Sequence, residues 1–331
     1  MTLINRKTSS LDEIRAPIAE ELKTFDRFFK EAMRSKVGLI DLIARYIIRQ
    51  KGKRVRPILV LLSAKACGGI IDSTYRGATL VEILHTATLI HDDVVDDADT
   101  RRGLASINAV WKNKVAVLMG DYLLARGLLL SLEQNDYAFL HSTSTAVKRM
   151  SEGELLQIQK SRQLDIDETT YLTIIGNKTA SLFSTCTEIG AMSVTDDPDR
   201  RRLLKEFGEN VGMAFQIRDD LLDYLGRRSI IGKPIGIDIK EKKLTLPLIH
   251  ALTQAERKDA KHVLKIIKNG AKQKEIEWVV NFVEKHGGID YAASKAEEYA
   301  TRARQNLTSL PETDAKESLL MFVDFVTERD S

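Results

Sequence analysis

Cysteine is scarce in this 331-residue chain, and its two cysteines, Cys67 and Cys186, stand far apart with no Cys-x-x-Cys spacing. Neither a disulfide framework nor a thiolate metal site is indicated, and we expect both residues to fill core space in a reducing cytosol. An excess of one charge is also missing, because 50 Lys and Arg against 47 Asp and Glu leave +3. A net charge this small does not indicate a nucleic acid or a membrane surface as a partner.

Long apolar runs are missing as well. No run approaches the ~18 residues of a membrane span, and the N-terminal Met1–Lys7 lacks the apolar region of a signal peptide. The protein is therefore expected to be cytoplasmic. The sequence contains no Walker loop, no GxGxxG, no GxSxG and no HExxH. Neither an activated nucleophile nor a hydride-carrying cofactor is indicated.

Strand alternation and an interdomain linker are absent too, whereas helical periodicity recurs along the chain. We predict a single domain over residues 1–331, an all-α bundle of more than ten helices around a central cavity. Helices are expected from the capping box at Ser10 to Met33, at 37–50 and at 58–66. The next helix has Asp72 or Ser73 as N-cap and runs to the end of an acidic stretch, and helices at 108–134 and 137–160 follow it. Further helices are expected from Asp167 as N-cap to 193, from Pro198 through 225, from 248, near 256, at 272–310 with a break near Gly287, and at 316–329. Residues 226–247 are predicted to form a long basic loop.

The acidic stretch is His91-Asp-Asp-Val-Val-Asp-Asp-Ala-Asp99, at the end of an apolar helical pattern. On a helix Asp92 and Asp96 share a face one turn apart, and Asp93 and Asp97 repeat the arrangement. Each like-charge pair costs the bare helix about 0.2–0.5 kcal/mol. Such crowding is explained best by a cation, and Mg²⁺ commonly takes one or two carboxylates plus substrate phosphates. An acidic, solvated helix end without function is the alternative at this point.

A second copy of the signature favours the metal site. Phe215-Gln-Ile-Arg-Asp-Asp-Leu-Leu-Asp-Tyr-Leu225 carries Asp-Asp-x-x-Asp at Asp219, Asp220 and Asp223, again among apolar residues. Helix bundles build metal sites from side chains that project inward on facing helices. The two motifs are therefore predicted to face each other with metal between them.

Basic residues lie where a phosphate would need them. Lys53 and Arg56 precede a helix start at Pro57, and Arg101 and Arg102 follow the first motif. Lys178 lies in an otherwise uncharged stretch that predicts burial, which is costly without an anion; Arg54, by contrast, is interpreted as an ordinary surface charge. A metal–diphosphate site in an apolar bundle indicates ionisation chemistry, in which an enclosed cavity protects a carbocation.

Together these segments resemble the trans-isoprenyl (polyprenyl) diphosphate synthases over nearly the whole chain. The resemblance rests on Gly52–Pro57, the first motif with Arg101–Gly103, Lys178–Thr179, Phe215–Gln216 with the second motif, and Gly232–Lys233 through Lys243–Pro247. It implies a helical homodimer with three Mg²⁺ ions. It also implies an allylic prenyl diphosphate that ionises and is attacked by isopentenyl diphosphate, and a product lipid delivered to membrane enzymes.

The resemblance also implies roles for individual residues. Asp92, Asp96 and Asp93 would hold two metals and Asp219 with Asp223 the third; Lys53, Arg56, His85 and Arg102 would bind isopentenyl diphosphate; Arg101, Lys178, Lys233 and Lys243 would bind the allylic diphosphate; Thr179 and Gln216 would line the path of the cation. Without the motif, His85 would be interpreted as an ordinary core histidine. The family usually has Gly before this last lysine, where this chain has Lys242; Lys243 is preferred over Lys242.

Chain length is predicted from two small residues. Thr88 lies one turn before Asp92 on the same face, and Ala87 lies ~7.5 Å before it along the helix. Bulky residues at these positions act as a floor in the family, so two small ones predict a long-chain product beyond geranylgeranyl diphosphate, for a quinone side chain. The alternatives are simple helix packing at Ala87, a short-chain (farnesyl or geranylgeranyl) synthase, a class I terpene cyclase or head-to-head prenyl synthase, and a non-catalytic subunit of a heteromeric synthase.

Overall fold

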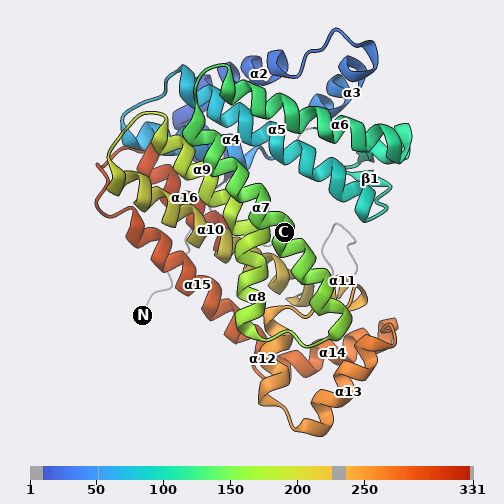
Figure 1. The fold of residues 1–331 in the computed structure, drawn as a ribbon. Coiled ribbons are helices and arrows are strands. Elements are labelled where there is room, and N and C mark those ends of the chain that lie inside the picture. The colour runs from blue at the N-terminus through green and yellow to red at the C-terminus, as the bar shows by residue number, and fades with distance from the viewer. Residues whose placement is uncertain (1–9, 51, 226–235, 329–331) are drawn as a thin grey trace.

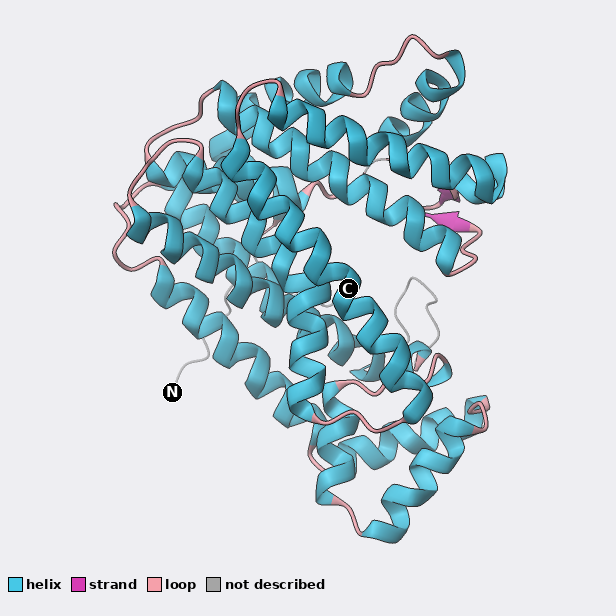
Figure 2. Ribbon diagram, in the orientation of Figure 1, coloured by secondary structure: helices cyan, strands magenta, loops and turns pink. Residues whose placement is uncertain are grey.

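The computed structural model describes residues 10–50, 52–225 and 236–328 of the chain. Within these ranges the protein is helical, apart from connecting loops and one short hairpin (Figures 1 and 2). The elements are α1 (Leu11–Arg15), the 3₁₀ turn η1 (Ala16–Ile18), α2 (Ala19–Ala32), α3 (Gly38–Arg49), α4 (Val55–Cys67), α5 (Asp72–Val95), β1 (Thr100–Arg101), β2 (Leu104–Ala105), α6 (Ile107–Leu132), α7 (Tyr137–Gln163), α8 (Glu168–Ile175), the π-helical segment η2 (Gly176–Ala180), α9 (Ser181–Met192), α10 (Pro198–Leu225), α11 (Ile237–Lys240), α12 (Leu246–Gln254), α13 (Arg257–Lys268), α14 (Gln273–Lys285), α15 (Gly288–Asn306) and α16 (Asp314–Glu328). The all-α prediction is confirmed.

Several helix starts follow from local capping. The capping box of Ser10 and Glu13 forms, with the Ser10 N–H donating to Glu13 at 2.8 Å. Asp167 accepts from the Thr170 N–H at 2.7 Å, and Asp197 accepts from the Asp199 N–H at 2.9 Å. These side chains satisfy backbone donors that have no partner inside the helix.

Several predicted boundaries are wrong. The first helix is interrupted by η1, because Pro17 cannot supply a backbone donor. The N-cap of α5 is Ile71 rather than Asp72 or Ser73, since the Thr74 hydroxyl accepts from the Ile71 N–H. Part of the predicted basic loop lies outside the described residues, and its remainder contains α11 and the start of α12. β1 and β2 pair as an antiparallel hairpin, which was not predicted because the segment shows no alternation of apolar and polar residues.

Two buried apolar clusters share two long helices, α10 and α15. The first joins α1–α7, α9 and α16 with the N-terminal half of α10 and the C-terminal half of α15, and the second joins α8, η2 and α11–α14 with the other halves of these two helices. Cys67 and Cys186 are free and buried, as predicted for core residues. Figure 1 shows the result as an elongated molecule, with α2, α3, α5 and α6 at one end and α12–α14 at the other.

Backbone contact holds the centre together. A Cβ on Gly190 of α9 would lie 2.4 Å from the Val60 carbonyl oxygen of α4. On the other side of α9, a Cβ on Gly208 of α10 would lie 2.6 Å from the Phe183 carbonyl oxygen. Real side chains do not come this close, so only glycine allows α4, α9 and α10 to approach to this distance.

α6 departs from expectation in another way. By length and composition it could cross a membrane, with a mean hydropathy of 1.6, although a core helix passes the same test. The sequence-based statement that no segment approaches a membrane span is therefore wrong for α6. Only 33% of its apolar window is buried in the chain.

Candidate active site

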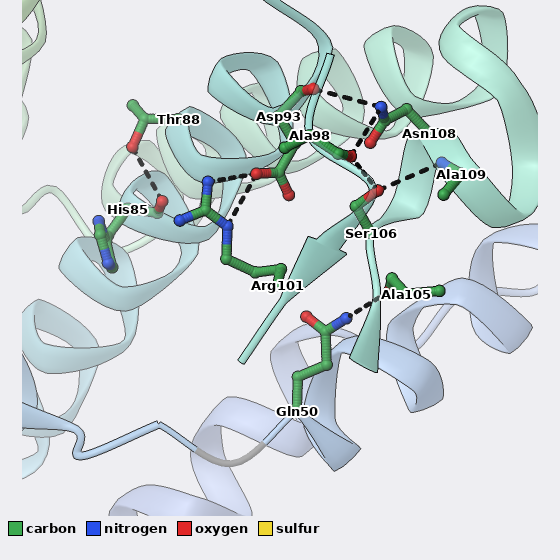
Figure 3. A network of polar contacts seen from close by, with 10 residues as sticks. All are labelled: Gln50, His85, Thr88, Asp93, Ala98, Arg101, Ala105, Ser106, Asn108 and Ala109. Atoms are coloured by element: carbon green, nitrogen blue, oxygen red, sulfur yellow. Dashed lines mark hydrogen bonds and ion pairs between the residues drawn. The ribbon is translucent and has the colours of Figure 1, made fainter. Parts of the chain in front are cut away.

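The first aspartate motif lies where α5 ends (Figure 3). The Asp96 N–H donates to the Asp92 carbonyl at 2.8 Å, so these two residues are one turn apart as predicted. Asp97 lies beyond the helix with a φ of +48°, and the predicted second pair of Asp93 with Asp97 is therefore not a helical pair. The side chains of Asp92 and Asp96 are exposed at this end.

Asp93 has a different environment. It is buried, and its carboxylate accepts from Arg101 Nε at 2.7 Å and from a second guanidinium nitrogen of Arg101. Asn108 of α6 donates at 3.2 Å to the carbonyl oxygens of Asp93 and Ala98, which fixes the loop that leads to the hairpin (Figure 3). Asp93 thus holds Arg101 beside the exposed carboxylates.

Lys178 approaches the first motif from η2. Partial shielding from water by the surrounding protein raises the pKa of Asp92, while the charge of Lys178 lowers it and the charges of Glu154 and Asp96 raise it. Lys178 Nζ pairs with Glu154 at 2.5 Å and donates to Gln157 at 3.3 Å. The side chain of Lys178 is 38% exposed, so its predicted burial is wrong. Its anion is a residue of α7 that nothing in the sequence singled out.

η2 interrupts the helix predicted over 167–193. π-Helical turns occur often at functional sites, and this one carries Lys178 and Thr179. Arg149 of α7 donates to the Gly176 carbonyl at 3.1 Å, to Asn177 Oδ1 at 3.0 Å and to Glu209 of α10 at 2.6 Å. Arg149 of α7, paired with Glu209 of α10, therefore holds η2 in place.

The second motif occupies the end of α10. Asp220 is buried and accepts from the Tyr171 hydroxyl at 2.7 Å and from Gln216 Nε2 at 2.8 Å; burial raises its pKa to about 7. Gln216 in turn accepts from Thr179 Oγ1 at 2.7 Å. A hydrogen-bonded chain thus connects η2 to the second motif. Tyr171 is a further residue that sequence reasoning missed.

The other two carboxylates of this motif differ. Asp223 accepts from the N–H groups of Ile237 and Asp238, both at 3.0 Å, at the start of α11. Asp219 is exposed. Asp238 lies nearby, and its pKa is raised to about 8 by burial and by the charges of Asp220 and Asp223.

Lys243 connects the two motifs electrostatically. Burial lowers the pKa of Lys243, but the hydrogen bond with Glu241 and the charges of Glu241, Asp238 and Asp96 raise it more. Asp96 belongs to the first motif, and the Asp238 N–H donates to Asp223 of the second, so Lys243 lies within electrostatic reach of acids beside both motifs. Lys242 instead donates to the Lys268 carbonyl at 3.0 Å, away from the aspartates. This geometry agrees with the preference for Lys243.

A cluster of basic residues lies further along α5. Arg56 and His85 come together with Arg102 around Glu82, a buried acid that sequence reasoning missed. Burial lowers the pKa of His85 well below its ordinary value, and the charges of Arg56 and Arg102 lower it further. Within the described chain, the buried Arg56 Nε and His85 Nδ1 have no hydrogen-bond partner. A guanidinium N–H of this kind suits an anionic ligand with several oxygens, and the neutral imidazole of His85 can donate one hydrogen bond.

Lys53, a predicted member of this cluster, and its neighbour Arg54 lie at its edge. Lys53 is exposed, with Nζ 6.0 Å from the centroid of the Phe325 ring. Arg54, interpreted from the sequence as an ordinary surface charge, is only 26% exposed and pairs with Asp26. That interpretation is wrong, because the left-handed backbone at Arg54 turns its side chain onto α2.

The remaining predicted residues lie as follows. Ala87 is fully buried on α5, and Thr88 donates to the His85 carbonyl at 2.8 Å (Figure 3). Lys233 lies outside the described residues.

The carboxylates fit hard divalent cations. Among the described residues no group of three His, Cys, Asp or Glu side chains forms a preassembled metal cage. Mg²⁺ does not require one, since it binds through one or two carboxylates together with substrate phosphates and water. Asp92 and Asp96 present this arrangement, and partial shielding from water together with the neighbouring acids Glu154 and Asp96 raises the pKa of Asp92. A cation would relieve that like-charge cost.

Comparison with known proteins agrees with this site. Residues 37–283 match the family model described as polyprenyl synthetase. The chain is 40% identical over 320 residues to the all-trans-nonaprenyl-diphosphate synthase (geranyl-diphosphate specific) of Rhodobacter capsulatus, with 96% of this chain and 97% of that protein covered. The crystal structure of a decaprenyl diphosphate synthase from Rhodobacter capsulatus superposes with a TM-score of 0.91 at 35% identity, covering 97% of this chain and 100% of that one.

A Caulobacter crescentus polyprenyl synthase, crystallised with calcium and isoprenyl diphosphate, matches with a TM-score of 0.89 at 34% identity, over 98% of this chain and 100% of that chain. The chain belongs to the polyprenyl synthetase family. It is an enzyme that transfers prenyl groups.

Proposed function

We propose that this enzyme condenses an allylic prenyl diphosphate with isopentenyl diphosphate, head to tail and in trans, and releases a long-chain all-trans polyprenyl diphosphate. The observation that carries the proposal is the placement of Lys178 near Asp92 and of Lys243 near acids of both aspartate motifs, beside a buried cluster in which Arg56 Nε and His85 Nδ1 have no hydrogen-bond partner among the described residues. One anion site lies at the aspartates and a second lies along α5, which is the number that two diphosphate substrates require.

The residues divide the work between the two substrates. Lys178, Arg101 and Lys243 neutralise the allylic diphosphate at the aspartates, and Asp93 keeps Arg101 in place. Arg56, His85 and Arg102 bind isopentenyl diphosphate. Mg²⁺ held by Asp92, Asp96 and Asp219, three ions by family resemblance, would withdraw electrons from the leaving diphosphate. Thr179 and Gln216 line the path over which the new carbon–carbon bond forms.

The site at Arg56 and His85 favours chain elongation over a reaction that only ionises the allylic diphosphate. The allylic carbon–oxygen bond breaks, the isopentenyl double bond attacks that carbon, and loss of a proton restores a double bond. A terpene cyclase would not need the Arg56 and His85 site, and a non-catalytic subunit would not need both aspartate motifs.

Incorporation of labelled isopentenyl diphosphate by the purified chain alone tests the reaction. We expect Mg²⁺-dependent incorporation into products longer than geranylgeranyl diphosphate, separated by reversed-phase thin-layer chromatography. Cyclised products without incorporation would indicate a cyclase, short products a short-chain synthase, and inactivity without a second protein a heteromeric subunit.

We also propose a cytoplasmic homodimer that delivers its product to membrane enzymes, such as those that attach quinone side chains. α6 presents an apolar face to solvent, with Leu118 59%, Leu129 48% and Val110 45% exposed. A second copy of the same face would cover these residues in an isologous interface. Leu118→Glu should shift the mass measured by light scattering from dimer to monomer, whereas Leu155→Glu on exposed α7 should not. A monomeric parent protein would contradict the proposal.

A further inference from the structure

A basic groove lies between α2 and α3, at the end of the molecule far from α13 (Figure 1). Its volume is about 620 Å³, and four cations line it: Lys30, Arg34, Arg45 and Arg49. Met33, Ala44 and Ile48 form an apolar floor. The single acid of the lining, Asp41, is paired with Arg45. The groove therefore combines an apolar base with a rim of four cations and one acid, a net charge of +3.

Charge is concentrated in this short segment. Residues 27–49 contain six Lys or Arg and two Asp or Glu, a net charge of +4, whereas the whole chain carries +3. Arg34, Lys36 and Arg49 are exposed. A cluster of this kind attracts an anionic surface within a Debye length.

Large apolar side chains lie exposed beside the cations. Val37 is 56%, Leu39 47% and Leu42 54% exposed, at the turn into α3 and along its first turns. Leu42 lies three residues before Arg45 and seven before Arg49, so the three share the outer face of α3. The inner face of α3 is held in place by Tyr46, whose hydroxyl donates to the Ala105 carbonyl at 2.8 Å. Leucine beside Arg and Lys on one outer face is typical of helices that lie in a membrane interface.

We propose that this α2–α3 surface docks the protein on an anionic phospholipid membrane. The cations contact lipid phosphates, and Val37, Leu39 and Leu42 enter the boundary of the acyl chains. A nucleic acid would satisfy the charges but would leave these aliphatic side chains in water. Docking does not depend on the reaction proposed above, yet it suits a product whose long tail is insoluble in water. Met33, on the groove floor, belongs to the same buried cluster as Ala87 of the predicted product path.

α13 provides a matched comparison. It carries five Lys or Arg (Arg257, Lys258, Lys261, Lys265 and Lys268), but its apolar residues Val263, Ile266 and Ile267 are buried against the bundle. It therefore offers charge without insertable aliphatic side chains. General attraction by positive charge would involve both surfaces, whereas docking by α2–α3 involves only one.

Flotation of the full-length, substrate-free protein with vesicles tests the proposal. The vesicles contain phosphatidylcholine alone, or phosphatidylcholine with a minority of anionic phosphatidylglycerol. We expect binding only to the anionic vesicles. The double variant Arg34→Glu/Arg49→Glu should weaken this binding more than about tenfold. Leu39→Ser/Leu42→Ser should weaken it without changing the charge.

The control variant Arg257→Glu/Lys258→Glu changes the charge of α13 by the same amount and should bind as the parent does. Equal loss of binding in this control, or undiminished binding by Arg34→Glu/Arg49→Glu, would overturn the proposal. A change of oligomeric state in the α2–α3 variants would assign the surface to a second copy instead, and would also overturn it. Prenyl transfer in detergent, measured on the same variants, reports on the proposed reaction separately.

Discussion

Carboxylates of the two aspartate motifs differ in the partners that the chain already gives them. Asp93 holds Arg101, Asp220 is bonded to Tyr171 and Gln216, and Asp223 accepts two backbone N–H groups. Asp92 and Asp96 instead lie exposed one turn apart. The carboxylates of each motif therefore have different roles. A carboxylate with several protein partners orients its neighbours, whereas an exposed carboxylate can bind a cation.

Replacing single aspartates tests that division. Asp92→Ala or Asp219→Ala should lower turnover by orders of magnitude, because a metal ligand is lost. The far-UV circular dichroism should stay helical, since removing one of several like charges does not destabilise the helix. Asp97→Ala, outside the helix and exposed, is the control and should keep most of the activity. Near-normal turnover of either main variant with Mg²⁺ present would contradict the two-motif site.

His85 gives a prediction on pH. Its folded-state pKa is lowered well below the ordinary value of 6.5 by burial and by Arg56 and Arg102, so below about pH 6.5 the unfolded chain binds a proton that the folded chain does not. Stability is therefore complete above that pH and falls as the pH decreases, by up to about 1.4 kcal/mol per pH unit. Urea unfolding of His85→Gln should show a smaller loss between about pH 7 and pH 5.5. Identical losses in parent and variant would show that His85 does not titrate as described.

Among the elements, η2 depends most on distant support. A π turn is strained relative to an α-helix, and Arg149 satisfies its Gly176 carbonyl while bonding Asn177. The Arg149–Glu209 pair thus positions Lys178 and Thr179 without touching substrate.

Arg149→Lys should therefore raise KM for the allylic diphosphate by about tenfold or more and lower kcat, because small displacements of positioned groups are costly. KM for isopentenyl diphosphate should change little, which a general loss of stability would not achieve. Lys148→Ala removes a neighbouring surface pair with Glu152 and serves as the control. Equal effects on both KM values would refute the positioning role.

α5 carries the prediction on product length. Ala87 is fully buried, and a phenylalanine there would project into the proposed path of the growing chain. Overpacking could cost about 1–3 kcal/mol of stability, but folded Ala87→Phe should still condense substrates and give sharply shorter products on reversed-phase thin-layer chromatography. Thr86→Phe, about 100° around the helix, should not shorten them. An unchanged product ladder from folded Ala87→Phe would place the path elsewhere.

Helices could be predicted well where their signals are local, as with the caps at Ser10, Asp167 and Asp197. The residues that pair with the predicted site residues could not be predicted. Glu154 pairs with Lys178 across two helices, and Tyr171 reaches Asp220 over 49 residues of sequence. Such pairs are set by tertiary packing, which no local pattern records. The two aspartate motifs could be recognised for the opposite reason, because each set lies within about one helical turn.

For the molecule as a whole, ligand and metal should stabilise the fold only together. Diphosphate alone adds negative charge beside Asp92 and Asp96, whereas Mg²⁺ makes the combination attractive. Thermal melts with diphosphate, with Mg²⁺ and with both should show a clear upward shift only for the combination. An equal shift from diphosphate with a chelator would argue that the basic residues alone bind the anion.

The glycine contacts at the centre of the molecule have a mechanical consequence. Where α9 meets α4 and α10 through backbone atoms, no side chain can change rotamer to let one helix slide past another. These three helices form a rigid spine, from which α10 projects the second motif and against which α5 holds the first. Closing of the enzyme around its substrates should then come from segments outside this spine, such as α2–α3 and α11–α14, and should leave the contacts of α9 with α4 and α10 unchanged.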